Sequence, residues 1–108
     1  MADGKTHIPR QHKRVSYVNE VEVVDLGTFR CSDLSLGGMY LETVQSFPVG
    51  DMVTVRFKLR HTDEHPIRIT ARVLYMHEGV GAGLAFVNLN PHDREMIEKF
   101  IDQNAGGA

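Results

Sequence analysis

The sequence contains no tryptophan, only one cysteine and no long apolar run. A lone cysteine cannot form an internal disulfide, which suits a reducing compartment. No segment approaches the roughly 18 to 20 apolar residues that cross a bilayer. The first fourteen residues, MADGKTHIPRQHKR, lack the apolar core of a secretory signal. We therefore expect a cytoplasmic protein that does not insert into a membrane.

The sequence also lacks an arrangement typical of catalysis. A hydrolase needs a nucleophile with its base, or two carboxylates held in a cleft, and no motif of that kind is present. Among the six histidines, His61 and His65 have the spacing of zinc-finger ligands, but no cysteine pair accompanies them. We expect solvated loop histidines, no metal, no cofactor and no enzymatic activity.

The length of 108 residues, with 42% hydrophobic and 24% charged residues, indicates a single globular domain. The charge is unevenly distributed: the whole chain carries a net charge of −2, yet its first fourteen residues hold Lys5, Arg10, Lys13 and Arg14 against Asp3 alone. A basic arm on an acidic body argues against a general nucleic-acid surface. It fits an arm that meets a compact anion. On charge alone, a solvated, disordered basic tail is the better interpretation.

Short segments of alternating polarity follow the arm, separated by turns such as PVGD at 48–51. The segment 52–60 is the clearest, with an inward face predicted to consist of Val53, Val55, Phe57 and Leu59. Cys31 alternates with Phe29 and is predicted to be a small core residue rather than a nucleophile. In the segment 67–78 the same alternation predicts these inward residues: Ile67, Ile69, Ala71, Val73 and Tyr75.

The last segment has helical periodicity. Asn90 is a candidate N-cap, Pro91 suits the first helical position, and an apolar stripe follows: Met96, Ile97, Phe100 and Ile101. Six short strands followed by one helix predict an all-β fold, a six-stranded antiparallel β-barrel with a C-terminal helix packed on it. The predicted organisation is a flexible arm at 1–14, the barrel and helix at 15–103, and a disordered tail at 104–108.

Two motifs remain that a barrel core does not require. The arm contains Arg10 and Arg14, four residues apart, and the stretch DLSLGG contains Asp33, Ser35 and Gly38. Each is a weak signal, since RxxxR arises by chance in basic stretches and DxSxxG also describes turns that cap themselves. Their order and separation within one small barrel are a stronger signal than either motif.

The combination resembles the PilZ domain family of bacterial cyclic di-GMP receptors. Arg10 and Arg14 match its RxxxR motif, and Asp33, Ser35 and Gly38 match its D/NxSxxG motif. The likeness continues through FPVGDMVTVRFKL, ARVLY and GAGLAFVNLNPHDREMIEKFI, and so covers nearly the whole chain from Pro9 onward. The resemblance implies the barrel fold, cyclic di-GMP as ligand, and these five motif residues as its binding site.

The chemistry of the motif residues agrees with that ligand. An arginine fork can donate two parallel hydrogen bonds to guanine O6 and N7, stack on a purine, or meet a phosphate. Asp33 is a natural acceptor for the N1 and N2 hydrogens of guanine. Ser35 offers one further hydrogen bond, and Gly38 permits close approach of the backbone. Tyr40 is a departure, because many relatives carry a basic residue two positions beyond the motif glycine.

The resemblance implies a stand-alone receptor whose arm becomes ordered on the ligand and signals to an unidentified effector protein. The stoichiometry stays open, because Pro9 precedes the first arginine. Two alternatives also remain. One is an interaction module of the same fold that needs no nucleotide, although such a module is expected to lack the motif arginines. The other is a barrel that binds single-stranded nucleic acid, which requires exposed aromatic residues on a basic face.

Overall fold

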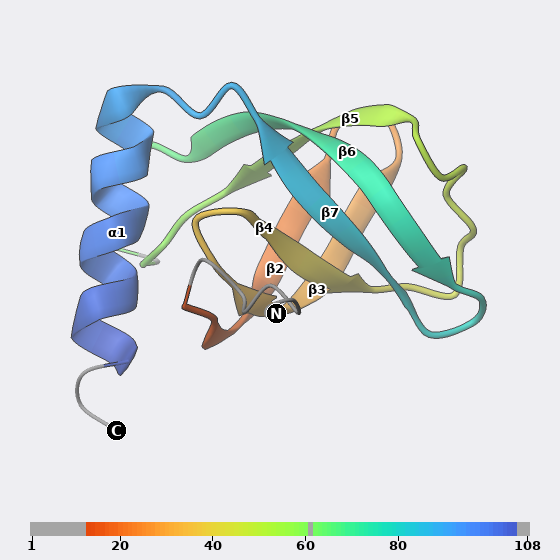
Figure 1. The fold of residues 1–108 in the computed structure, drawn as a ribbon, viewed down its shortest axis with the longest axis horizontal. Helices are drawn as coiled ribbons and strands as arrows, with labels where there is room; N and C mark the ends of the chain where they lie inside the picture. The colour runs from red at the N-terminus through yellow and green to blue at the C-terminus, as the bar shows by residue number, and fades with distance from the viewer. Residues whose placement is uncertain (1–12, 61, 106–108) are drawn as a thin grey trace, which may run out of the picture.

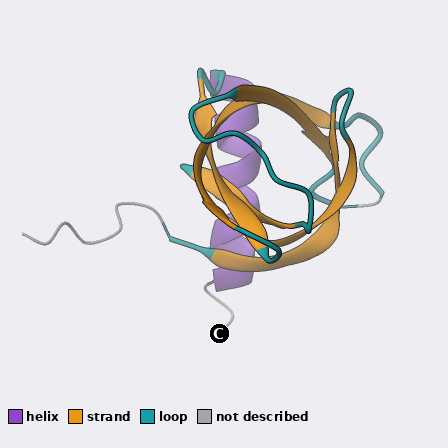
Figure 2. Cartoon of the chain, turned by 90° about the vertical axis from the view of Figure 1, so that its right-hand side faces the viewer, coloured by secondary structure: helices purple, strands orange, loops and turns teal. Residues whose placement is uncertain are grey.

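The structure is a computed structural model that describes residues 13–60 and 62–105. It contains six strands and one helix: β2 (Val15–Val23), β3 (Gly27–Leu34), β4 (Gly38–Glu42), β5 (Met52–Phe57), β6 (Ile67–His77), β7 (Gly81–Val87) and α1 (Pro91–Ala105). The strands form a closed barrel in the order β2-β3-β4-β7-β6-β5, and every pairing is antiparallel. Viewed end-on, the strands make a ring with the helix behind it (Figure 2). The predicted fold class is confirmed.

The core is formed by the inward-facing residues of all six strands. Val55 and Phe57 are buried as the alternation in β5 predicts, and so are Met39 and Leu41 of β4. Cys31 is fully buried among them, which confirms its prediction as a core residue. Burying this apolar surface provides the main driving force for closing the barrel.

The prediction that Tyr75 faces the core is wrong. Its side chain is 43% exposed, while Val73, two residues earlier, is fully buried. The pairing of β6 with β7 shifts register between these two residues, which marks a β-bulge. A bulge inserts one extra residue into the strand and reverses the faces beyond it. Tyr75 and His77 therefore point to the outside of the barrel.

The helix α1 lies across one end of the barrel (Figure 1). Its first turn is capped by Asn90, whose Oδ1 accepts a hydrogen bond from the backbone N–H of Asp93 at 2.8 Å, as the sequence predicts. Ile97, Phe100 and Ile101 are buried, and the Phe100 ring meets the Tyr17 ring edge-on, with centroids 5.7 Å apart. The helix continues to Ala105, so its last two residues fall in the segment predicted as a tail.

The barrel closes where β2 pairs with β5, and this pairing is short. Only two residue pairs join β2 to β5, namely Glu22 with Arg56 and Val23 with Val55. We call this region the β2–β5 seam, and an ion pair between the Glu22 and Arg56 side chains spans its outer face. Within residues 13–60 and 62–105, no helix is long and apolar enough to cross a membrane.

Candidate ligand-binding site

Arg14 and Asp33 form an ion pair on the outside of the barrel. Arg14 immediately precedes β2, whose first two residues pair with Leu34 and Asp33 at the end of β3. The pairing of the strands therefore sets Arg14 beside Asp33, although nineteen positions separate them in the sequence. Both side chains remain accessible, with exposed fractions of 36% and 32%. Arg10, the other arginine of the predicted site, lies outside the described residues, as do positions 1–12 of the predicted arm.

A second β-bulge directs Asp33 outward. The pairing of β3 with β4 shifts register between Cys31 and Asp33, and both Cys31 and Leu34 are fully buried. Two residues, one of them Asp33, thus lie between the inward-facing Cys31 and Leu34. Regular alternation would leave only one, and the extra residue allows Asp33 to face solvent. The Cys31 thiol donates a hydrogen bond to the Asp33 carbonyl oxygen at 3.1 Å, and burial raises the pKa of this thiol to about 12. At neutral pH Cys31 is a protonated core side chain.

Ser35 organises the turn that connects β3 with β4. Its Oγ accepts hydrogen bonds from the backbone N–H groups of Gly37 and Gly38, at 3.1 and 3.2 Å. Its own N–H donates to the Gly38 carbonyl oxygen at 2.9 Å. The side chain is only 2% exposed. The hydroxyl of Ser35 therefore holds the shape of the turn that follows Asp33.

Gly38 is needed because β7 passes against the backbone of this turn. A Cβ atom at this position would lie 1.9 Å from the Leu84 carbonyl oxygen, far inside van der Waals contact. The Gly37 carbonyl oxygen also accepts a hydrogen bond from the Phe86 N–H at 2.9 Å. Gly38 does not have a positive φ, so the space requirement and not the turn conformation explains the glycine.

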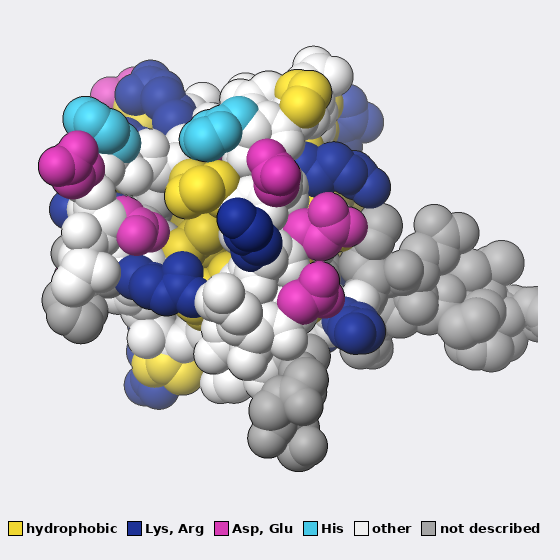
Figure 3. All heavy atoms as spheres, turned by 90° about the vertical axis from the view of Figure 1, so that its left-hand side faces the viewer, with side chains coloured by type: hydrophobic (Ala, Val, Ile, Leu, Met, Phe, Trp, Pro, Cys, Tyr) yellow, Lys and Arg dark blue, Asp and Glu magenta, His cyan; other side chains and the backbone are white. Residues whose placement is uncertain are grey.

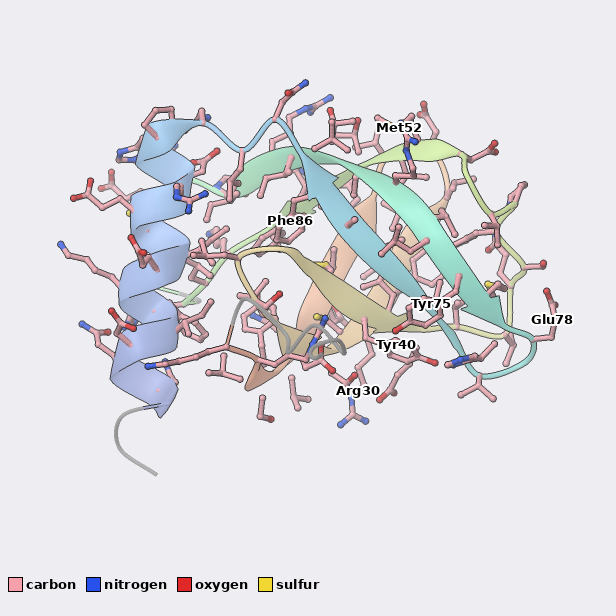
Figure 4. The ribbon with its side chains drawn as sticks, in the orientation of Figure 1. Arg30, Tyr40, Met52, Tyr75, Glu78 and Phe86 are labelled. Carbon is pink, nitrogen blue, oxygen red and sulfur yellow. The ribbon has the colours of Figure 1, made fainter. Side chains whose placement is uncertain are left out.

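Sequence reasoning missed an aromatic cluster that lies beside Asp33. Tyr40 is the partner of Asp33 in β4, Gly83 is the partner of Tyr40 in β7, and Tyr75 is the partner of Gly83 in β6. Tyr40 and Tyr75 lie next to each other on the outside of the barrel (Figure 4), with ring centroids 6.3 Å apart. We call the outward surface of β3, β4, β7 and β6 the outer wall. The alternating glycines at 81 and 83 were the one sequence signal for this cluster, because they leave room for large neighbours.

Charges of both signs lie around the site. Arg30 of β3 approaches Glu42 of β4 at 3.7 Å, next to the row of Asp33 and Tyr40. Acidic and basic side chains are also interspersed on the helix side of the molecule (Figure 3). Among the described residues no group of three His, Cys, Asp or Glu side chains is placed to hold a metal ion. A paired guanidinium and carboxylate next to exposed aromatic rings can bind a flat heterocycle that carries an anionic group.

The fold and this site define a class of protein: a small closed barrel with a terminal helix and an Arg–Asp contact where the first strand meets the β3–β4 turn. The PilZ domain model matches residues 9–103, and the chain belongs to the PilZ domain family. The family likeness drawn from the two motifs is thereby confirmed. No curated protein matches the chain significantly.

Three solved structures are similar in fold. The inhibitor of motility MotI/DgrA from Bacillus subtilis has a TM-score of 0.80 and 18% identity, over 91% of this chain and 51% of that one. YcgR from Escherichia coli in complex with c-di-GMP has a TM-score of 0.69 and 17% identity, over 91% of this chain and 46% of that one. The chain thus spans about half the length of these two proteins. The PilZ domain of YcgR with c-di-GMP has a TM-score of 0.65 and 19% identity, over 91% and 92% of the two chains.

Proposed function

We propose that this protein is a non-catalytic, cytoplasmic receptor for cyclic di-GMP. The observation that carries this proposal is the contact between Arg14 and Asp33, one residue from each of the two motifs. Membership of the PilZ domain family and the c-di-GMP in the two YcgR structures support the same ligand.

In the proposed complex, Arg14 and Arg10 bind the guanine O6 and N7 atoms or the phosphates of the ligand. Asp33 accepts hydrogen bonds from the N1 and N2 hydrogens of a guanine. Ser35 and Gly38 complete the site, and their contacts in the turn support a role in presenting Asp33 and the backbone to the ligand. The existing ion pair also holds Arg14 and Asp33 near each other before a ligand arrives, which lowers the entropic cost of binding.

Ligand binding orders the arm at residues 1–14 over the outside of the barrel, and a partner protein recognises the ordered form. The start of β2 directly after Arg14 supports this step, because it anchors the end of the arm to the barrel beside Asp33. Hydrogen exchange of the arm amides, measured with and without cyclic di-GMP, tests it. We expect slower exchange at residues 5–14 in the complex, and equal exchange in both states contradicts the ordering step.

The test of the receptor function is calorimetric titration of the protein with cyclic di-GMP. We expect micromolar or tighter binding by the wild type, about −8 kcal/mol or better. Arg14→Ala and Asp33→Ala each remove a charged partner and should abolish or severely weaken binding. Matched controls are Arg56→Ala and Glu22→Ala, which break the comparably exposed ion pair at the β2–β5 seam and should bind like the wild type.

A folded wild type that releases no heat and shows no binding by equilibrium dialysis overturns the receptor function. That result favours a protein-interaction module of the same fold that works without the nucleotide. Equal losses in the Arg14 and Arg56 variants also contradict the proposed site, because they indicate a general charge effect rather than a specific contact.

A further inference from the structure

The two ends of the barrel differ in what covers them. The helix α1 lies across one end (Figure 1). The opposite end, which we call the distal end, is formed by the connections between β2 and β3, between β4 and β5, and between β6 and β7. These connections are residues 24–26, 43–51 and 78–80. Figure 2 looks onto the distal end, which no helix of the described residues covers.

Exposed apolar side chains gather at the distal end. Among the described residues, six large apolar side chains that are exposed lie in these connections or on strand residues beside them: Leu26, Val44, Val49, Met52, Leu74 and Val80. Val44 is 86% exposed and Val80 is 61% exposed. Single exposed apolar side chains are common on protein surfaces, whereas a group of them at one place marks an interaction surface.

Hydrogen bonds and one buried ring hold the distal connections in a fixed conformation. The Thr43 N–H donates to the Val80 carbonyl oxygen at 3.0 Å, which joins two of the connections. The Ser46 hydroxyl donates to the Glu78 carboxylate, also at 3.0 Å. The Phe47 side chain is buried in the core and anchors the longest connection to the barrel. The surface is therefore formed before a partner arrives, which lowers the entropic cost of docking.

The charges at the distal end are all of one sign. The three connections contain the exposed carboxylates Asp25, Asp51 and Glu78 and no lysine or arginine. A hollow of about 250 Å³ lies between Leu26 and Met52, with Asp25 at its edge. Apolar side chains with carboxylates around them fit a partner that places lysine or arginine next to apolar groups. The same carboxylates disfavour an anionic membrane, and they would repel each other in a symmetric dimer through this end.

We propose that the distal end is a docking surface for a partner protein whose apolar side chains are flanked by lysine or arginine. This inference goes beyond the proposed cyclic di-GMP site and does not depend on it. The β3–β4 turn and the 43–51 connection lie at opposite ends of β4, with its five residues between them. Because the distal surface is formed without a ligand, docking requires no cyclic di-GMP.

The experiment uses short synthetic peptides as probes of the partner's chemistry. A peptide of leucine and lysine residues is titrated into the isotope-labelled full chain without cyclic di-GMP, and NMR chemical shifts report where it binds. We expect shift changes concentrated at the distal end. A leucine–glutamate peptide lacks the positive charge and a serine–lysine peptide lacks the apolar groups, so each should bind at least about fivefold more weakly.

Substitution of the exposed valines tests the apolar contribution. The Val44→Ser, Val80→Ser double variant should bind the leucine–lysine peptide about fivefold more weakly or less, with unchanged thermal unfolding, because both side chains are exposed. The matched control is Val18→Ser, since Val18 is an exposed valine of β2 outside the distal end. This variant should bind the peptide like the wild type.

Neutralising the carboxylates tests the contribution of charge. The triple variant Asp25→Asn, Asp51→Asn, Glu78→Gln keeps the shape of the surface, because asparagine tolerates the φ of 69° at Asp25 and glutamine still accepts a hydrogen bond from Ser46. Binding of the leucine–lysine peptide should weaken with added salt in the wild type and should lose this salt dependence in the triple variant.

Four results would overturn the docking surface. They are shift changes spread over the whole barrel, equal binding of all three peptides, a dimer in sedimentation velocity that the double valine variant abolishes, and binding to phosphatidylglycerol vesicles that the same variant abolishes. The third result would assign the distal end to a second copy of the chain, and the fourth to a membrane. A protein that binds the leucine–lysine peptide at the distal end but binds no cyclic di-GMP keeps the docking surface and loses only the receptor function.

Discussion

The outer wall and the β2–β5 seam lie on opposite sides of one barrel, and they are built differently. On the seam side, β5 pairs with β6 without a register shift, and its outer face carries charged side chains such as Arg56. The pairing of β2 with β3 does shift register, but between Ser16 and Asn19, at the end of β2 that lies beside Asp33 and not at the seam. The outer wall contains two bulges, two glycines covered by aromatic rings, and the Asp33 carboxylate. Regular alternation is sufficient for a solvated face. The bulges and the covered glycines lie beside the motif residues. This indicates that a requirement other than folding determines the structure of the outer wall.

Among substitutions on the outer wall, we expect the largest loss of stability from a change at Gly38. Gly38→Ala places a Cβ atom 1.9 Å from the Leu84 carbonyl oxygen, so β4 and β7 must separate. We expect a loss of about 4 kcal/mol or more in the free energy of unfolding, measured by urea denaturation, or failure to fold.

The control for Gly38 is Gly79→Asn. Gly79 has a φ of 77° with nothing near its Cβ position, and asparagine tolerates this conformation. A loss of less than about 1 kcal/mol is expected there. If Gly38→Ala is equally mild, the close approach of β7 does not constrain the site.

The second prediction concerns how the stability of the fold depends on pH. It compares one buried titratable side chain from each region. Burial raises the pKa of Cys31, behind the outer wall, from 9.0 to about 12, and that of Tyr17, near the β2–β5 seam, from 10.0 to about 12. Both groups favour the folded state while protonated. Their stabilising contribution is therefore complete below pH 9 and is lost as the pH rises toward 12.

We expect the free energy of unfolding to fall by about 2 to 3 kcal/mol between pH 9 and pH 11 from Cys31. Urea denaturation across this range measures the change, and Cys31→Ala should move its onset to about pH 10, where Tyr17 begins to contribute. An unchanged onset in Cys31→Ala contradicts the assignment to this thiol.

A smaller loss of stability is expected from a change in the turn between β3 and β4. Ser35→Ala leaves the N–H groups of Gly37 and Gly38 without the side-chain acceptor that they now use. We expect a loss of about 1 to 2 kcal/mol, measured by thermal unfolding. Ser46→Ala, which removes an exposed hydrogen bond to Glu78 in another loop, should cost less. Equal losses would show that Ser35 does not organise its turn.

The smallest effect on stability is expected from the two exposed ion pairs. Arg14→Ala on the outer wall and Arg56→Ala at the β2–β5 seam should each change the free energy of unfolding by less than about 1 kcal/mol. Denaturation of both variants in parallel checks this. A large loss for Arg14→Ala alone would mean that the Arg14–Asp33 contact serves the fold rather than a ligand.

Much of this molecule is predictable because its local patterns agree with its fold. The period of two in β5, the cap at Asn90 and the apolar stripe of α1 are local properties, and each is confirmed. The residues of the proposed ligand site were predicted as two separate motifs. The structure sets Arg14 beside Asp33, but Arg10 lies outside the described residues, so its place in the site stays a prediction.

The sequence by itself determined the strand faces wherever alternation is unbroken, and the helix and its cap, because these depend on neighbours within a few positions. Only the tertiary structure decided that Tyr75 faces outward and that Gly38 lies against Leu84. The physical reason is that a bulge depends on the register between two strands, and the space at a glycine depends on a strand far away in sequence. Both are properties of strand pairing, which alternation within a single strand does not encode.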